Sequence, residues 1–215
     1  MKIAIIGYGK MGHMIEKIAL RRGHEIVCII DTDRDEWAKI SQADVAIEFT
    51  TPSTAEANIR RAWAAGVPVV CGTTGFHGDI MMREEGTPGL IWKSNFSEGV
   101  AMVFEFVENA ARNIFFKRLD YKASISETHH IHKLDAPSGT AKTMAETYAR
   151  ITHTIPEAIP IESVREGEVP GTHTMTLDSE EDTIIITHIA KGREGFALGA
   201  VLAAEELCNS KATIR

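Results

Sequence analysis

Cysteine is scarce in this chain, and its three copies have no spacing that a metal or a disulfide framework would use. Cys28, Cys71 and Cys208 are odd in number and far apart. Disulfide frameworks use even numbers of cysteines, and zinc sites use closely spaced pairs. We therefore expect three reduced thiols, two of them within apolar, strand-like runs.

Long hydrophobic runs are also missing. No apolar stretch reaches the roughly 20 residues that a membrane-spanning helix needs. The segment from Met1 to Ile6 carries one lysine and then four apolar residues before a glycine, which is too short for the apolar region of a signal peptide. We expect a cytoplasmic protein without a membrane partner.

The sequence has no excess of positive charge. It holds 23 Lys and Arg against 30 Asp and Glu, for a formal net charge of -7. Diffuse binding to nucleic acid needs a basic face, so nucleic acid is not an expected partner. Repeats and low-complexity segments are absent too, and 215 residues with 44% hydrophobic composition suffice for one large domain or two small ones.

The first half of the chain alternates short apolar runs with helical patterns. Residues 11–22 and 52–65 carry apolar side chains at helical spacing. The runs that predict strands are residues 2–6, 25–30, 44–49, 67–71 and 89–92. Regular alternation of strand and helix predicts a parallel sheet with right-handed crossovers.

The pattern changes after residue 97. We predict helices at 98–113, 138–150 and 196–207, and strands at 118–127, 159–165, 172–177 and 183–189. Several of these strands follow one another directly, as in mixed α+β domains. The predicted fold class is α/β, with an N-terminal Rossmann-like parallel sheet in residues 1–97 and a C-terminal mixed α+β domain in residues 98–196.

Gly7, Gly9 and Gly12 form a Gly-x-Gly-x-x-Gly pattern between the first predicted strand and the first predicted helix. In that context the first glycine permits the tight turn and the second lets a pyrophosphate approach the backbone. The third lets the helix pack against the strand, and the helix N-terminus faces the diphosphate. Together with Lys10 and Met11, the loop predicts a dinucleotide-binding domain.

Asp31 ends the second strand, where the dinucleotide fingerprint has its acidic residue. A carboxylate there accepts hydrogen bonds from both ribose hydroxyls, which favours NADH, and it repels the 2′-phosphate of NADPH. Arg34 and Lys10 could offset that repulsion, so the sequence leaves NADH, NADPH or both open as the cofactor. The alternative is a glycine turn with a surface aspartate, which the combined strand, helix and spacing disfavour.

Two further loops follow predicted strands at the same edge of the sheet, which is where open parallel sheets bind ligands. Their small and polar residues would let a cofactor's nicotinamide side reach the backbone. The residues expected to line the cofactor there are Gly72, Thr73, Thr74, Lys93, Ser94, Asn95 and Phe96.

The densest chemistry lies between residues 127 and 140, where histidines and a lysine precede a predicted helix. Ser138 is a favourable N-cap residue, and the N–H groups of Gly139 and Thr140 would face a carboxylate in front of the helix. Lys133 and His130 would add positive charge. The segment therefore predicts a binding site for a small acidic substrate, in spite of the negative net charge.

A metal site is the alternative interpretation of the histidines. In an extended segment His130 and His132 share a face while His129 points away. No cysteine pair or His-Glu-x-x-His helix supplies the further ligands that zinc needs, so we expect no metal. An unspecific surface run of histidines is less favoured, because the run adjoins a capped helix.

Several segments together resemble the dihydrodipicolinate reductase family. They are residues 7–12, 48–52, 72–75, 95–97, 127–140 and 195–200, which span nearly the whole chain. The string His-His-x-His-Lys-x-Asp-Ala-Pro-Ser-Gly-Thr-Ala is long and specific. The resemblance implies reduction of 4-hydroxy-tetrahydrodipicolinate, a small dicarboxylate, to tetrahydrodipicolinate with NADH or NADPH in diaminopimelate and lysine biosynthesis.

The resemblance also implies roles for particular residues. His129 and Lys133 would transfer the proton, and the sequence does not decide which of them delivers it. The substrate carboxylates would be held by His130, Lys133, Ser138, Gly139 and Thr140. A helix in residues 197–215 would return to the first domain, and the second domain would build a homotetramer through its sheet. Two departures are the shorter chain and Asp31-Thr32, where NADPH-using members have Glu-Arg or a similar pair.

Two other functions fit part of the sequence. A different Rossmann dehydrogenase, for example one acting on aspartate, shares the nucleotide half but does not explain the His-Lys segment. A module that senses the NAD/NADH ratio needs an output surface, often a basic helix-turn-helix, and neither the motifs nor the charge distribution offers one.

Overall fold

The computed structural model describes residues 1–76 and 86–213, which form two compact units. Unit 1 consists of Met1–Ser97 and Arg193–Arg215, and unit 2 of Glu98–Gly192. The last helix, α5 (Glu194–Thr213), belongs to unit 1 although it follows unit 2 in the sequence. Within the described residues no helix combines the length and the hydropathy needed to cross a bilayer.

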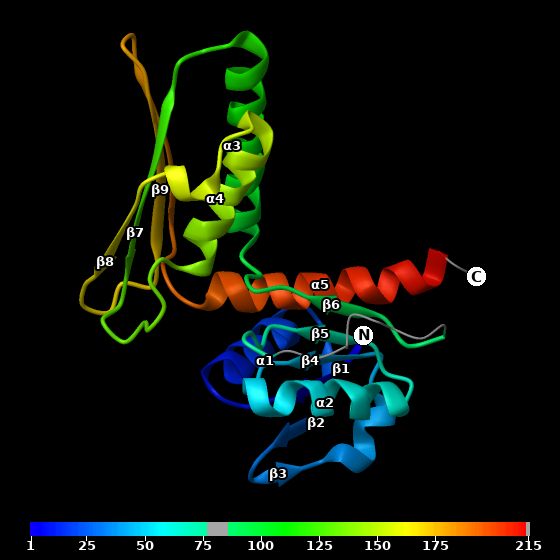
Figure 1. Cartoon of the computed structure of the whole chain (residues 1–215). Helices are drawn as coiled ribbons and strands as arrows, with labels where there is room; N and C mark the ends of the chain where they lie inside the picture. Colours follow the sequence, from blue (N-terminus) through cyan, green and yellow to red (C-terminus); the bar gives the residue numbers. More distant parts are fainter. Residues whose placement is uncertain (77–85, 214–215) are drawn as a thin grey trace. The chain divides into compact units, whose positions relative to one another are not determined.

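Unit 1 is built on a sheet with the strand order β3-β2-β1-β4-β5-β6 (Figure 1). Five strands are parallel, which confirms the predicted Rossmann-like sheet. They are β1 (Lys2–Ile6), β2 (Glu25–Asp31), β4 (Val45–Glu48), β5 (Val69–Cys71) and β6 (Leu90–Trp92). The antiparallel β3 (Arg34–Asp35) was not predicted, because two residues carry no periodicity.

Helices cover both faces of this sheet. Side chains of β1 alternate between two cores, with Ile3 and Ile5 in one and Ala4 and Ile6 in the other. Parallel strands buried on both faces read as continuous apolar runs, as β1 does. The first core includes α1 (Lys10–Arg21) and α5, and the second includes α2 (Pro52–Ala64) and the short helix η1 (Trp37–Gln42).

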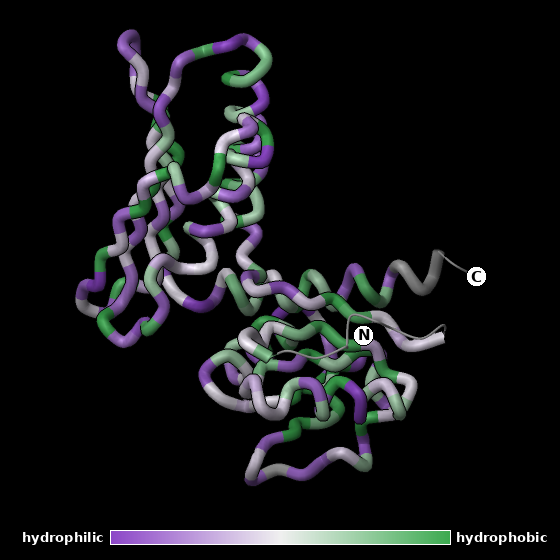
Figure 2. The backbone as a smooth tube through the Cα atoms, viewed as in Figure 1, coloured by the Kyte–Doolittle hydropathy of each residue, from purple (hydrophilic) through white to green (hydrophobic). Residues whose placement is uncertain are grey.

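Unit 2 has a four-stranded sheet in the order β10-β9-β7-β8 (Figure 1). The pair β7–β8 is parallel and the other pairs are antiparallel, which confirms the predicted mixed sheet. The strands are β7 (Lys122–His129), β8 (Ile161–Arg165), β9 (Thr172–Asp178) and β10 (Thr183–Ile189). Buried and partly buried residues alternate along β9, and Figure 2 shows hydrophobic and hydrophilic residues interspersed along the long strands of this unit.

Two helices, α3 (Glu98–Lys117) and α4 (Gly139–Thr152), pack on one face of this second sheet (Figure 1). The short helix η3 (Pro156–Ala158) links α4 to β8. Their apolar faces share a core with Ile125, Met175 and Leu177 of the strands. That core fixes the end of β7 and the start of α4, the two elements that carry the candidate chemistry.

The predicted boundary near residue 118 was wrong. We predicted a helix to residue 113 and a strand from 118, but α3 continues to Lys117 and β7 begins at Lys122. The aromatic and β-branched residues after Asn113 favour a strand locally. Ile114, however, continues the buried row of Val107 and Ala111 at helical spacing, so tertiary packing extends the helix.

Candidate active site

The glycine loop after β1 is shaped by close backbone packing at its two ends. A Cβ added at Gly7, whose φ is +92°, would lie 2.1 Å from the carbonyl oxygen of Phe49. One added at Gly12 would lie 2.3 Å from the carbonyl oxygen of Gly7. At Gly9 a Cβ would meet nothing within 4 Å. The middle glycine therefore leaves its backbone open to an approaching phosphate, as the motif requires.

Asp31 lies at the end of β2, beside this loop. Its Oδ2 accepts the backbone N–H of Tyr8 at 2.8 Å, and its Oδ1 accepts that of Thr32 at 2.7 Å. Lys10 is exposed at the start of α1. The side chain of Arg34, which we expected to offset a negative charge, lies outside the described residues.

The loop after β5 is held in place by contacts with neighbouring elements of unit 1. The backbone N–H of Thr50 donates to Oγ1 of Thr73 at 2.8 Å, and the indole of Trp92 donates to the Thr73 carbonyl at 2.8 Å. Gly72 packs against the Phe49 ring, where an added Cβ would lie 2.1 Å from Cε1. These contacts give Gly72 and the buried side chain of Thr73 a structural part in the loop.

The loop after β6 contains both buried and exposed residues. Phe96 is buried, with its ring tilted against that of Phe49 at a centroid distance of 6.0 Å, while Asn95 Oδ1 accepts the Ser97 N–H at 2.8 Å. The Lys93 ammonium lies 5.8 Å from the Phe96 ring. The predicted cofactor residues of the two loops whose side chains are exposed are Thr74, Lys93 and Ser94.

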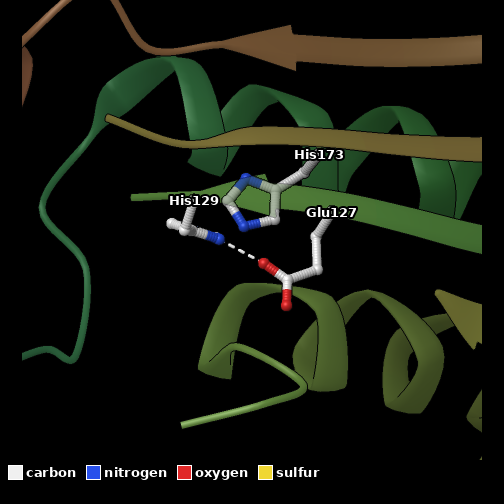
Figure 3. Close-up of side chains that lie close together, drawn as sticks. All are labelled: Glu127, His129 and His173. Carbon is white, nitrogen blue, oxygen red and sulfur yellow. Dashed lines mark hydrogen bonds and ion pairs between the residues drawn. The ribbon is translucent and has the colours of Figure 1, made fainter. Parts of the chain in front are cut away.

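The end of β7 brings Glu127 and His129 to one face, because alternate residues of a strand point the same way. Glu127 is 1% exposed and His129 is 7% exposed. Oε2 of Glu127 lies in hydrogen-bond contact with Nδ1 of His129 (Figure 3). The Glu127 contact therefore holds the Nδ1 side of the buried His129 ring. His129 is not part of a solvated run of histidines.

Arg165 fixes the other side of the carboxylate. It lies opposite His129 in the β7–β8 pairing, and its Nη2 donates to Oε1 of Glu127 at 3.0 Å. The same guanidinium donates to the backbone carbonyls of Lys133 and Asp135. Arg165 therefore connects the Glu127–His129 pair on β7 to the loop that carries Lys133.

His173 lies on β9, beside Glu127 in the pairing and edge-on to His129, with ring centroids 4.8 Å apart. Its Nε2 is 3.1 Å from Oγ of Ser138, while its buried Nδ1 has no hydrogen-bond partner in the described part of the chain. Figure 3 shows the three side chains gathered at the end of the sheet.

Burial dominates the titration of the two histidines. It lowers the pKa of His129 below 6.5, although the Glu127 carboxylate opposes the shift. It lowers the pKa of His173 to about 4, and the neighbouring His129 adds to that effect. Burial raises the pKa of Glu127, but the hydrogen bond from Arg165, together with the His129 contact, brings it below 4.5. Near neutral pH the cluster is an anionic carboxylate beside neutral imidazoles.

The loop after β7 carries Lys133, whose Nζ is 2.7 Å from Oδ1 of Asp135. Its side chain is partly buried, at 23% exposed, and its ammonium already holds a carboxylate. His130 has a buried Nδ1 without a hydrogen-bond partner among the described residues. His132 is exposed and faces Glu168 at 3.2 Å. Of the histidines in the run, only His129 joins the buried cluster.

Ser138 is the N-cap of α4, as predicted, with its Oγ accepting the backbone N–H of Ala141 at 3.2 Å. Its side chain is buried and also faces His173. At Gly139 an added Cβ would meet nothing within 4 Å. The helix start is therefore open at Gly139, while the Ser138 hydroxyl is hydrogen-bonded inside the protein.

Glu127, His129 and His173 each offer an atom within 4.8 Å of the other two, which a metal ion could in principle use. Both carboxylate oxygens already have protein partners, and one of these partners is the cationic Arg165. A guanidinium at that distance opposes a second cation. We therefore interpret the cluster as a hydrogen-bonded network.

The sequence interpretation missed Glu127, Arg165 and His173 as members of the site. The strand predicted at 118–127 stops at Glu127, whereas β7 continues to His129. Had the strand been extended by two residues, the Glu-x-His spacing would have indicated the pair, because alternate residues of a strand share a face. Arg165 and His173 lie on other strands, and only the sheet register brings them to His129.

Comparison with known proteins decides the family. Residues 1–96 match the N-terminal model of dihydrodipicolinate reductase and residues 99–215 its C-terminal model. This chain belongs to the dihydrodipicolinate reductase family. The 4-hydroxy-tetrahydrodipicolinate reductase of Christiangramia forsetii is 42% identical over 221 residues, covering 96% of this chain and 92% of that protein. That of Archaeoglobus fulgidus is 35% identical, covering 95% and 93%.

A dipicolinate-bound dihydrodipicolinate reductase from Paenisporosarcina sp. TG-14 has the same fold. The TM-score is 0.79 at 23% identity, with 97% of this chain and 94% of that one covered. Membership of the family makes the chain an oxidoreductase. The interpretations as a redox sensor or as an aspartate dehydrogenase are therefore set aside.

Proposed function

We propose that this chain reduces 4-hydroxy-tetrahydrodipicolinate to tetrahydrodipicolinate in diaminopimelate and lysine biosynthesis. The product has hydrogen where the substrate has a hydroxyl group, so turnover consumes one hydride and one proton and releases one water. The observation that carries the proposal is the arrangement of a buried Glu127–His129 pair, a partly exposed Lys133 and an open helix start at Gly139, in a member of this family.

The substrate carboxylates are held by Lys133, His130 and the backbone at Gly139 and Thr140. Lys133 already binds the Asp135 carboxylate, so its ammonium is placed to exchange that partner for a substrate carboxylate. A helix N-terminus favours anions through its backbone N–H groups and its dipole. Ser138 supports this site from inside, by capping α4. Two anchored carboxylates orient the ring for hydride transfer.

His129 delivers the proton, and Lys133 serves as the electrostatic clamp. With Nδ1 on Glu127, the other ring nitrogen is the one available to a substrate. In the free protein burial holds the pKa of His129 below 6.5. A bound dicarboxylate raises that pKa, because opposite charges favour the charged form. Substrate binding therefore prepares the proton donor.

The coenzyme is a reduced nicotinamide dinucleotide, NADH in preference to NADPH, and when bound it supplies the hydride. Gly9 leaves room for the pyrophosphate, and the Asp31 carboxylate faces the loop where the adenosine ribose would lie. That carboxylate accepts hydrogen bonds from ribose hydroxyls and repels a 2′-phosphate. Lys10, Met11, Thr74, Lys93, Ser94 and Asn95 are the remaining candidates for cofactor contacts.

We propose a homotetramer formed through the sheet of unit 2. The edge strand β10 exposes Ile185 by 63% and Ile189 by 66%, and exposed apolar edge strands invite pairing with another chain. Light scattering on size-exclusion chromatography gives the mass directly. Ile185→Lys should lower the mass of the assembly, and a monomeric wild-type protein would contradict the proposal.

Binding of dipicolinate, a planar relative of the substrate, tests the substrate site without turnover. Calorimetric titration of the wild-type protein with dipicolinate, in the presence of NADH, should give saturable binding. Lys122→Ala removes an exposed lysine at the start of β7, the opposite end of the strand from His129, and should bind as the wild type does. No binding by the folded wild-type protein would contradict the proposed substrate class.

A further inference from the structure

Glu127 is a fully buried carboxylate whose two oxygens have different partners. Oε2 contacts Nδ1 of His129, and Oε1 accepts Nη2 of Arg165 at 3.0 Å and the backbone N–H of Ser138 at 3.3 Å. Removing a carboxylate from water is costly unless its oxygens are hydrogen-bonded. Here strand β8 and the cap of α4 hold the group on one side, so that it faces His129 on the other.

This arrangement dictates the protonation pattern of His129. An anionic carboxylate only accepts, so Nδ1 must carry the hydrogen that joins it to Glu127. In the neutral ring Nε2 is then the bare nitrogen, and in the cation Nε2–H is the proton available for transfer. Gly171 lies beside Nε2 and has no side chain to crowd it, since a Cβ added there would lie 3.0 Å from this nitrogen.

We propose that Glu127 is a positioning residue that fixes the Nδ1–H form of His129, so that Nε2 exchanges the proton, and that Arg165 holds Glu127 in place. Neither residue touches substrate in this proposal. It rests on the proposed function for the role of His129, and it adds the pair of residues that set the state of the imidazole.

The groups that face His129 have opposing effects on its charge. Glu127 from the same strand stabilises the imidazolium, while Arg165 from β8 and Lys133 from the following loop destabilise it. His173 from β9 is neutral near pH 7, since burial lowers its pKa to about 4. Removing the Glu127 charge should therefore lower the pKa of His129, and removing the Arg165 charge should raise it.

The test combines ¹⁵N–¹H NMR of the imidazoles with pH profiles of kcat/KM. In the wild type the NMR spectrum should show the Nδ1–H form of His129. In Glu127→Gln the pKa of His129 should fall by about 1–3 units, as expected for loss of an adjacent opposite charge. The alkaline limb of kcat/KM should move with it, and kcat should drop roughly 10²- to 10⁴-fold. Glu127→Asp keeps the charge and should recover part of the loss.

The matched control is Glu162→Gln, an exposed glutamate on β8, which should leave both readouts at wild-type values. A Glu127→Gln protein with unchanged tautomer and pKa of His129 would overturn the proposal, and so would lost turnover with an unshifted pH profile. If Glu127→Gln does not fold by circular dichroism, Arg165→Gln decides: a rise in the pKa of His129 supports the proposal, and no rise overturns it.

The NMR measurements need no substrate. A wild-type protein that shows the expected tautomer but turns over no 4-hydroxy-tetrahydrodipicolinate would contradict the proposed function alone. Turnover together with the other tautomer would contradict the positioning role alone.

Discussion

The backbone N–H of Tyr8 donates to Oδ2 of Asp31 at 2.8 Å, across 23 positions of sequence. The bond ties the glycine loop to the end of β2, so one carboxylate both shapes the loop and faces the expected ribose. Coenzyme choice and loop structure are therefore linked through Asp31.

Asp31→Asn should shift coenzyme use from NADH toward NADPH. The amide keeps an acceptor for Tyr8 but loses the charge that repels a 2′-phosphate. A hydrogen bond to a charged group contributes about 1.5–3 kcal/mol. The kcat/KM for NADH divided by that for NADPH should therefore fall roughly 10- to 100-fold. Steady-state kinetics with both coenzymes measures it, and Asp33→Asn, exposed two residues on, is the control. An unchanged ratio would remove Asp31 from coenzyme selection.

Lys133→Ala should lose turnover while NADH affinity survives. The variant loses the ammonium that pairs with Asp135 and, in our proposal, with a substrate carboxylate. We expect kcat/KM to fall roughly 10²- to 10³-fold, because a charged partner of a bound carboxylate is removed. Fluorescence titration with NADH should match the wild type, and equal loss of both properties would contradict a substrate role for Lys133.

Gly199→Ala should destabilise unit 1. An added Cβ would lie 1.6 Å from the carbonyl oxygen of Phe96, so α5 must move away from the chain it packs against. Overpacking of this kind costs about 1–3 kcal/mol. Gly195→Ala, on the same helix, places its Cβ 3.9 Å from the nearest atom, Oγ of Ser97. Urea unfolding should show a lower midpoint for the first variant only, and equal midpoints would contradict the close approach.

Acid should destabilise the protein through His173. Its pKa is about 4 in the folded state and 6.5 ordinarily. The unfolded chain therefore binds a proton first as the pH falls. This contribution to stability is fully present above pH 6.5 and is lost as the pH falls toward 4, by on the order of 3 kcal/mol in total.

The free energy of unfolding, measured in urea between pH 7 and 4, should decline less steeply in His173→Gln than in the wild type. His132→Gln, an exposed histidine, should follow the wild-type slope. Parallel slopes for His173→Gln and the wild type would mean that His173 titrates alike in both states.

The sequence predicted the parallel sheet of unit 1 because its strands are buried on both faces and read as apolar runs. It also predicted the cap at Ser138, because capping is local chemistry. The end of α3 escaped prediction, since Ile114 continues a buried row that only the folded core defines. Strand β3 is too short to leave a pattern.

The candidate site was predictable in part. His129 and Lys133 stand in one continuous motif, whereas Arg165 and His173 reach it through sheet register. Long-range pairing of this kind leaves no periodicity in the sequence. Glu127 also stands in the motif, but its role depends on the burial of its carboxylate. The position of a residue at the end of a strand does not predict that burial.

Turnover of 4-hydroxy-tetrahydrodipicolinate by this chain is measured in a coupled assay. Purified synthase condenses pyruvate with aspartate semialdehyde, and the loss of reduced-nicotinamide absorbance is followed with NADH and then with NADPH. We expect oxidation that depends on the synthase and is faster with NADH. A folded protein that binds NADH but oxidises neither coenzyme under these conditions would contradict the proposed reaction.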